Sequence, residues 1–226
     1  MLNEKDFYKA FKEVILKDDR VIVLYSGLSN FIYNIKFNNK NIPKIFLDIL
    51  EEIVTKNRTL ILPSFSGNSF LKEDKFDIKK TIDNIGILPK EALKRKYFRT
   101  VQPLHSYLVY GKEKEEIKKL KNLTSWGDSS ILGYISKRNA RICTFGLPWN
   151  QGCAYLHRFE ELSLVPWRYF KSFRGSLYKT EKKLAFVLKK NTALHQIISC
   201  NTISSRLYHI LKKPKATLNL LTKIST

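Results

Sequence analysis

The stretch Arg141–Glu161, RICTFGLPWNQGCAYLHRFEE, indicates most clearly how this chain folds. Its first five residues are short, apolar and rich in β-formers, which predicts a strand. Gly146 and Pro148 then end the strand, and a polar turn leads into a predicted helix. A strand followed directly by a helix is the repeating unit of α/β domains.

The predicted helix carries a thiol, an imidazole and two carboxylates. Cys153, His157 and either Glu160 or Glu161 are three or four residues apart, so they share one helical face. Open α/β folds place their chemistry just beyond the carboxyl ends of strands, where this face begins. The alternative is a half-buried histidine that only hydrogen-bonds a neighbouring carboxylate, and on spacing alone this alternative is favoured.

Working outward, helices and buried strands alternate along much of the chain. Apolar residues at helical spacing, capping residues and first-turn prolines predict helices at 4–15, 42–53, 112–120, 131–137 and 203–211, and one beginning at 87. Short apolar runs predict strands at 21–25, 59–62, 106–110 and 184–188. Residues 31–41 and 64–80 show no clear period. The order of elements predicts an α/β sandwich.

The chain is strongly basic, with 41 lysines and arginines, 20 aspartates and glutamates, and a formal net charge of +21. Such a field attracts anions: nucleic acid, acidic membrane or phosphorylated small molecules. No apolar run approaches the length that spans a bilayer, and the first residues lack a signal-peptide core. Three cysteines without a CxxC pair argue against a disulfide framework and a zinc site. We expect a cytoplasmic protein without a metal.

The composition changes near the carboxyl end. Residues 179–226 contain a single acid, Glu181, and ten lysines and arginines. We therefore divide the chain into an α/β core, residues 1–178, and a basic strand–helix segment, residues 179–226, that completes the same domain. Whether this segment rests on an anionic membrane, and whether the protein forms a homodimer, stay open at this point.

Five segments, in order along the chain, resemble motifs of the aminoglycoside 3-N-acetyltransferase family. They are VIVLYSGLS (21–29), RTLILPSFS (58–66), RTVQPLHSYLVYG (99–111), GDSS (127–130) and the opening stretch (141–161). Two departures stand out: Tyr25 occupies a usual histidine position, and Cys153-Ala154 replaces the usual Asn-Thr. The resemblance implies a three-layer α/β/α sandwich around a mixed sheet, unrelated to the GNAT fold.

The resemblance also implies acyl transfer from acyl-coenzyme A to an amine. An amine is mostly protonated at neutral pH, so it must lose a proton before it attacks a thioester, and a histidine is suited to take that proton. The matching positions give His157 as the general base and Glu160 as the carboxylate that fixes its tautomer. The developing oxyanion requires hydrogen-bond donors nearby, which the sequence does not locate.

The remaining site residues follow from the same motifs. Residues after the first strand lie where the family holds coenzyme A, and backbone N–H groups in such turns bind phosphate well. The predicted coenzyme A-binding residues are Ser26, Gly27, Leu28, Ser29, Ser64 and Ser106, and the predicted acceptor-binding residues are Arg99, His105, Asp128 and Cys153. His105 has an alternative role as a loop histidine, and Asp128 has one as a helix cap, which is favoured.

Cys153 could also act as an acyl-accepting nucleophile in a Cys–His pair. Because members of the family transfer the acyl group directly, we expect no covalent intermediate on this thiol.

The acceptor is the least defined partner. Aminoglycosides are polycations that a +21 protein repels at long range, whereas anionic acceptors gain association rate. We therefore favour a nucleotide-linked amino sugar over an aminoglycoside. The alternative of another class, a nucleic-acid or acidic-membrane binding protein, is supported by the lysines and by the aromatic–basic run near Phe170–Arg174. The absence of any RNA-binding or zinc signature counts against specific nucleic-acid binding.

Overall fold

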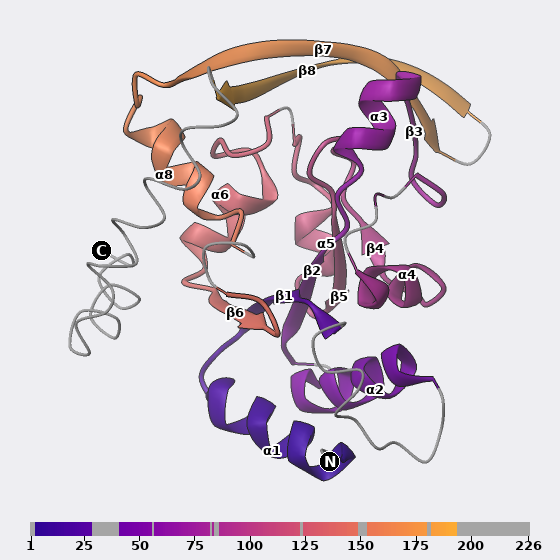
Figure 1. Ribbon diagram of the computed structural model, residues 1–226, viewed down its shortest axis with the longest axis vertical. Helices are drawn as coiled ribbons and strands as arrows, with labels where there is room; N and C mark the ends of the chain where they lie inside the picture. The colour runs from indigo at the N-terminus through magenta and orange to yellow at the C-terminus, as the bar shows by residue number, and fades with distance from the viewer. Residues whose placement is uncertain are drawn as a thin grey trace.

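The structure is a computed structural model that describes residues 3–28, 41–55, 57–81, 83, 86–122, 124–148, 153–179 and 182–193, the last range by its backbone (Figure 1). Two sheets organise these residues: a central five-stranded sheet and a second, three-stranded sheet. In Figure 1 the second sheet arches over one end of the molecule, and α1 and α2 lie at the opposite end.

The central sheet has the strand order β4-β5-β2-β1-β6. Strand β1 (Val21–Ser26) lies parallel to both β2 (Thr59–Pro63) and β6 (Arg141–Phe145). Strand β5 (Tyr107–Gly111) runs antiparallel to β2 and to the short β4 (Phe98–Arg99). β1 and β2 are buried along almost their whole length, which explains their continuous apolar sequences.

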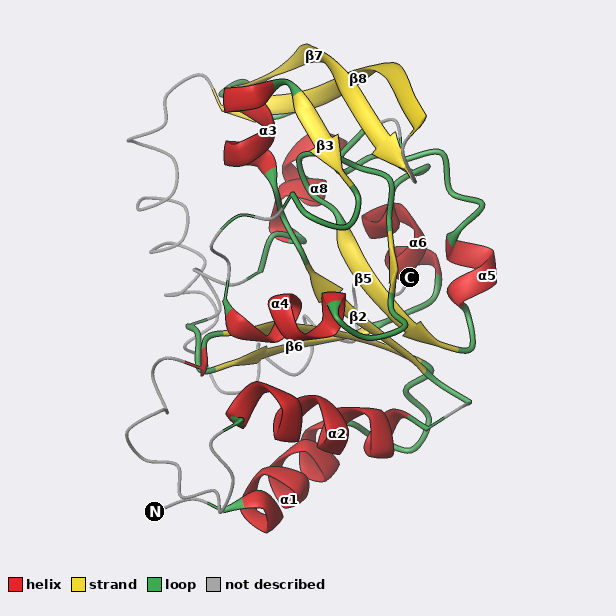
Figure 2. Ribbon diagram, turned by 90° about the vertical axis from the view of Figure 1, so that its right-hand side faces the viewer, coloured by secondary structure: helices red, strands yellow, loops and turns green. Residues whose placement is uncertain are grey.

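Helices α1 (Glu4–Val14), α2 (Ile42–Val54) and α4 (Ile87–Leu93) pack on one face of this sheet. Figure 2 shows α1 and α2 stacked on the same side. The predicted N-cap of α1 is confirmed: the Asn3 side chain accepts the Lys5 and Asp6 N–H groups, and Asp6 accepts the Asn3 N–H in return. Such a capping box satisfies N–H groups that have no partner inside the helix.

Helices α5 (Lys114–Ile117), α6 (Ile131–Lys137) and α8 (Leu156–Leu162) contribute to the layer on the opposite face. Successive strand residues point to opposite faces, so Ile22 and Leu24 pack in the first layer while Val21 and Val23 pack in the second. The mixed sheet between two helical layers confirms the predicted three-layer α/β/α fold.

The second sheet was not predicted. It contains β3 (Lys75–Asp77), β7 (Arg168–Lys179) and β8 (Lys182–Ala193), with β7 antiparallel to β8 over twelve residue pairs. The strand predicted at 184–188 lies within β8. Helix α3 (Gly67–Glu73) leads into β3, so the stretch without a clear period at 64–80 folds into a helix and a strand.

Several predicted boundaries are wrong. Cys153 is not on the helix of His157: it lies in a turn, and α8 begins at Leu156 after the N-cap Tyr155. The helix expected at 112–120 is a single turn, α5. The loop at 31–40 and the helix at 203–211 lie outside the described residues. No helix in the described part of the chain is long and apolar enough to cross a bilayer.

Candidate active site

One edge of the central sheet gathers most of the predicted site residues. Because β1, β2 and β6 are parallel, their carboxyl ends share this edge, and β5 begins there, with Tyr107 opposite Pro63. The loops that follow β1, β2 and β6 and the loop that precedes β5 therefore meet at one place. Open α/β sheets bind ligands at the carboxyl ends of their strands.

Arg99, Ser64 and Ser106 form a buried hydrogen-bonded cluster beneath this edge. The Arg99 guanidinium donates to Ser106 Oγ at 3.1 Å and to the Ser64 carbonyl at 2.7 Å, and Ser106 Oγ donates to the same carbonyl at 2.6 Å. Burial lowers the pKa of Arg99 to about 10, and its side chain stacks on the Phe76 ring. All three residues are 3% exposed or less. The cluster therefore links the loop after β2 to the loop between β4 and β5 in the protein interior.

The end of β1 differs from the expectation of free backbone donors. The Gly27 N–H donates to the Phe145 carbonyl at 2.8 Å, because the pairing of β1 with β6 continues one residue beyond the strand. Leu28 is 2% exposed and belongs to the core. A Cβ at Gly27 would lie 2.5 Å from a Leu147 methyl carbon, so the two loops approach closely here. Ser26 is half-buried, and Ser29 lies outside the described residues.

A row of aromatic rings leads from the sheet edge to His157. The centroid separations are 5.0 Å from Phe65 to His105, 4.3 Å from His105 to Trp126 and 5.2 Å from Trp126 to His157. His105 Nδ1 lies 2.9 Å from Ser125 Oγ. The predicted residues His105 and His157 therefore lie on the two sides of one buried tryptophan, which the sequence did not single out.

His157 and Glu160 form the pair that the sequence suggested. His157 Nδ1 is 2.6 Å from Glu160 Oε2, one helical turn along α8. Burial opposes ionisation of Glu160, but the hydrogen bond and the charges of His157 and Arg168 outweigh it, so the pKa of this carboxyl is lowered. The side chain of His157 is 34% exposed, which leaves the imidazole accessible while its carboxylate partner is more enclosed.

Arg168, the first residue of β7, joins this pair from the second sheet. Its Nη2 lies 2.5 Å from Glu160 Oε2 and 2.8 Å from His157 Nδ1. The sequence pattern did not single out this residue. The only sequence signal was a single arginine within the aromatic run VPWRYF. The sequence does not show which face of a strand this arginine occupies, so its contact with α8 could not be predicted.

Asp128 pairs with a buried arginine instead of capping α6. The cap of that helix is Ser130, whose side chain accepts the Gly133 N–H, so the favoured capping role of Asp128 was wrong. Arg158 donates to the Trp126 carbonyl at 2.6 Å and to Asp128 Oδ1 at 2.5 Å. These bonds tie α8 to the turn before α6 and thereby hold Trp126 beside His157.

Cys153 is enclosed beside the aromatic residues of the second helical layer. It is 6% exposed and packs in the same core cluster as Tyr25 and Tyr155. Burial raises the pKa of its thiol to about 11, although backbone N–H groups of Tyr155 and Leu156 oppose the shift. A neutral, buried thiol is a poor nucleophile, and this agrees with the expected absence of a covalent intermediate.

Buried polar atoms without partners are concentrated around His157. Among the described side chains these atoms are Trp126 Nε1, Arg158 Nε, Glu161 Oε2 and Arg168 Nε. Folded proteins leave few such atoms, and each one calls for an explanation. All four belong to α8 or to residues that contact it, which makes this part of the fold the candidate site. The described residues hold no group of three or more potential metal ligands.

Comparison with protein-family models gives a match to the aminoglycoside 3-N-acetyltransferase model over residues 35–209, more than half of the chain. The chain belongs to this family. It is therefore an acyl-coenzyme A-dependent N-acyltransferase, and the pair on α8 is its candidate catalytic centre. No curated protein sequence matches significantly.

Solved structures of low sequence identity share the fold, and several of them are aminoglycoside acetyltransferases. AAC-IIIb in a binary complex with CoASH matches with a TM-score of 0.73 and 14% identity, over 92% of this chain and 85% of that chain. AAC-VIa bound to sisomicin matches with a TM-score of 0.70 and 11% identity, over 84% of this chain and 76% of that chain. The YokD protein from Bacillus subtilis matches with a TM-score of 0.68 and 17% identity, over 84% of this chain and 81% of that chain.

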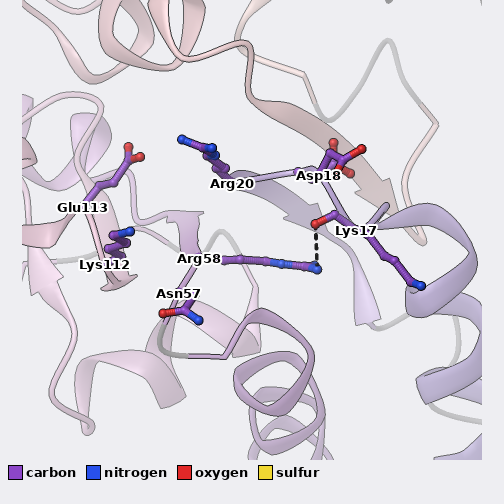
Figure 3. Close-up of a pocket in the computed structure, with 8 residues that line it drawn as sticks. Lys17, Asp18, Arg20, Asn57, Arg58, Lys112 and Glu113 are labelled. Atoms are coloured by element: carbon purple, nitrogen blue, oxygen red, sulfur yellow. Dashed lines mark hydrogen bonds between the residues drawn. The ribbon is translucent and has the colours of Figure 1, made fainter.

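A surface cavity of about 700 Å³ lies at the opposite edge of the sheet of this acetyltransferase-family protein (Figure 3). Its eight lining residues precede β1 and β2 or follow β5: Lys17, Asp18, Asp19, Arg20, Asn57, Arg58, Lys112 and Glu113. None of them is a predicted site residue. A second cavity of about 220 Å³ is lined by Phe65, Asp83 and His105, among others, and adjoins the candidate centre.

Proposed function

We propose that His157 is the general base of this N-acyltransferase and that Glu160 orients it. The observation that carries the proposal is the 2.6 Å hydrogen bond between His157 Nδ1 and Glu160 Oε2. When Nδ1–H donates to the carboxylate, the lone pair of the imidazole is on Nε2. Such an arrangement fixes the tautomer and stabilises the imidazolium that forms during proton transfer.

The reaction then follows from ordinary acyl-transfer chemistry. Nε2 of His157 takes one proton from the acceptor ammonium, and the neutral amine attacks the thioester carbonyl to form a C–N bond. In the tetrahedral intermediate this nitrogen carries a second proton in excess. As the C–S bond breaks, that second proton passes to the coenzyme A thiolate, which leaves as the thiol, and His157 later releases the first proton to solvent. General base catalysis of this kind contributes about 10²–10⁴ in rate.

For the donor, the residues near the sheet edge are the proposed contacts. A binary complex of AAC-IIIb with CoASH supports coenzyme A binding in this fold. At the end of β1, Ser26 remains the candidate contact, whereas Gly27 already uses its N–H and Leu28 is buried. Ser64 and Ser106 are enclosed, so we assign them a supporting role under the donor rather than direct contact.

For the acceptor, we propose an amino sugar, and the net charge of +21 favours one linked to a nucleotide. Electrostatic attraction accelerates the binding of anions and slows that of polycations. Two carboxylates near the turn at Trp126–Gly127, those of Asp128 and Glu161, are the proposed partners of the acceptor ammonium. A Cβ placed at Gly127 would lie 3.4 Å from Glu161 Oε1, so Glu161 borders this turn.

An aminoglycoside is the second candidate acceptor. It is supported by the family to which the chain belongs and by the neighbours solved with sisomicin and with a gentamicin. Burial raises the pKa of Glu161, Arg158 opposes this shift and the charge of Asp128 adds to it. A bound polycation would relieve that repulsion between the two carboxylates.

The experiment is an assay of thiol release from acetyl-coenzyme A with a nucleoside-diphosphate amino sugar or a kanamycin-type aminoglycoside as acceptor, at several salt concentrations. We expect turnover of the nucleotide sugar, with a KM that rises with salt because screening weakens the attraction. Efficient turnover of the aminoglycoside alone would overturn the preferred acceptor and leave the aminoglycoside. Turnover of neither, with no coenzyme A binding, would contradict the acyltransferase proposal.

A further inference from the structure

Three atoms converge at the candidate centre. Glu160 Oε2 is 2.6 Å from His157 Nδ1 and 2.5 Å from Arg168 Nη2, and Nη2 is 2.8 Å from Nδ1. We propose that Arg168 is a positioning residue that holds the Glu160 carboxylate against His157 and so keeps the imidazole in its base-competent tautomer. This inference rests on the proposed function, because Arg168 acts only through Glu160 and His157. Arg168 itself makes no contact with the substrate in this proposal.

The hydrogen-bonding capacities of the three groups support this assignment. A guanidinium can only donate, and a carboxylate oxygen can accept more than one hydrogen bond. In the base-competent tautomer Nη2 and Nδ1–H both donate to Oε2, whereas the 2.8 Å contact between Nη2 and Nδ1 is a hydrogen bond only in the tautomer whose Nδ1 accepts. If Nδ1 instead accepted from Arg168, the ring proton would be on Nε2, and the imidazole could not act as a base toward the acceptor.

Burial makes each member of this ion pair depend on the other. The side chains of Arg168 and Glu160 are 8% and 17% exposed, so water competes little for either charge. Removing one member of such a pair leaves the other without compensation in a poorly solvated place. A Glu160 carboxylate without Arg168 would turn toward water and release His157 from its orientation.

The position of Arg168 in β7 explains how it reaches α8. The backbone N–H of Arg168 donates to the Val165 carbonyl at 3.2 Å, which closes the turn between α8 and β7. The flanking Trp167 and Tyr169 are exposed, whereas the Arg168 side chain is enclosed. The second sheet thus supplies a cation to a pair on α8, and Figure 1 shows β7 beginning just beyond that helix.

The alternative is a structural ion pair that joins α8 to β7 without affecting the reaction. The two roles predict different kinetics. A structural role lowers the fraction of folded protein and leaves the kcat of folded molecules unchanged. A positioning role lowers kcat of fully folded protein, because a small displacement of a catalytic group can reduce the rate roughly 100-fold.

The test compares Arg168→Ala, Arg168→Lys and the matched control Arg174→Ala, which removes an equal charge from an exposed position of the same strand. We expect Arg168→Ala to lose roughly 100-fold in kcat with little change in KM for acetyl-coenzyme A. Arg168→Lys keeps the charge without the planar fork and should recover part of the loss. Added guanidinium should restore part of the activity of Arg168→Ala, and Arg174→Ala should match wild type.

Two results would overturn the inference. One is an Arg168→Ala protein with the kcat of Arg174→Ala. The other is a loss that follows the unfolded fraction in thermal melts and that neither guanidinium nor lysine relieves. The proposed function is tested separately by His157→Ala: if that variant is inactive while Arg168→Ala is normal, only the role of Arg168 fails. A double variant His157→Ala with Arg168→Ala should lose no more than His157→Ala alone, because residues of one unit are not additive.

Discussion

Side chains at the candidate centre differ in how far solvent reaches them. The imidazole of His157 is 34% exposed, while Arg99, Ser64 and Ser106 are almost fully enclosed. A group that exchanges a proton with a substrate must be reachable, which is consistent with the base role proposed for His157 and with a supporting role for the enclosed residues. The family resemblance singled out His157 and Glu160. Helical spacing alone predicted only that the histidine shares a face with a carboxylate, and it left Glu160 and Glu161 both open.

Cys153 provides a prediction about reactivity. Burial raises the pKa of the Cys153 thiol to about 11, so the thiol is almost entirely protonated near neutral pH. We expect Cys153→Ala to retain kcat, and we expect intact-mass spectrometry of wild type mixed with acetyl-coenzyme A to show no acyl adduct. Truncating one buried sulfur lowers stability by about 1 kcal/mol, measured by chemical denaturation.

Cys143 serves as the control for that prediction, because it is also buried and its thiol pKa is also raised to about 11. Both thiols should react slowly with an alkylating reagent in the folded protein. An acyl adduct that disappears in Cys153→Ala, together with lost turnover, would contradict direct transfer.

Secondary structure was predictable where a single local rule decided it. The strand at 21–25 is a buried apolar run, and the helix at 131–137 has its Ser130 cap; both were confirmed. Cys153 was misplaced because the pattern of polar and apolar residues continues through the turn before α8. The second sheet was missed because β3 is three residues long and pairs with a strand about one hundred residues away, which no local period reports.

Gly175 of β7 tests how the second sheet supports the site. A Cβ at this position would lie 2.5 Å from the Phe70 ring and 2.9 Å from the Asp74 carbonyl oxygen. Phe70 is fully buried, so neither neighbour can move easily. We expect Gly175→Ala to lower the free energy of unfolding by about 1–3 kcal/mol and to lower kcat, because β7 carries Arg168.

Ser172→Ala, at an exposed position of the same strand, is the matched control and should leave both quantities unchanged. Stability is measured by urea denaturation and kcat by thiol release. A Gly175→Ala protein with wild-type stability and kcat would show that the packing of β7 on α3 does not support the site.

For the molecule as a whole, the two edges of the central sheet carry different features. The carboxyl edge holds the His157–Glu160 pair and all four unpartnered buried polar atoms found among the described side chains. The larger of the two cavities described above lies at the other edge (Figure 3). Cavity size alone points to the edge opposite the proposed catalytic pair. The three-layer fold was predictable from the order of elements together with the family resemblance, but the contribution of the second sheet to the centre was not.

The central claim is that this protein transfers acyl groups with His157 as the base. The most direct measurement is kcat for acetyl transfer from acetyl-coenzyme A, at near-neutral pH, by wild type and by His157→Ala under the same conditions. The account predicts that His157→Ala folds normally, binds coenzyme A and loses at least about 100-fold in kcat. A folded His157→Ala protein with near-normal turnover would contradict it.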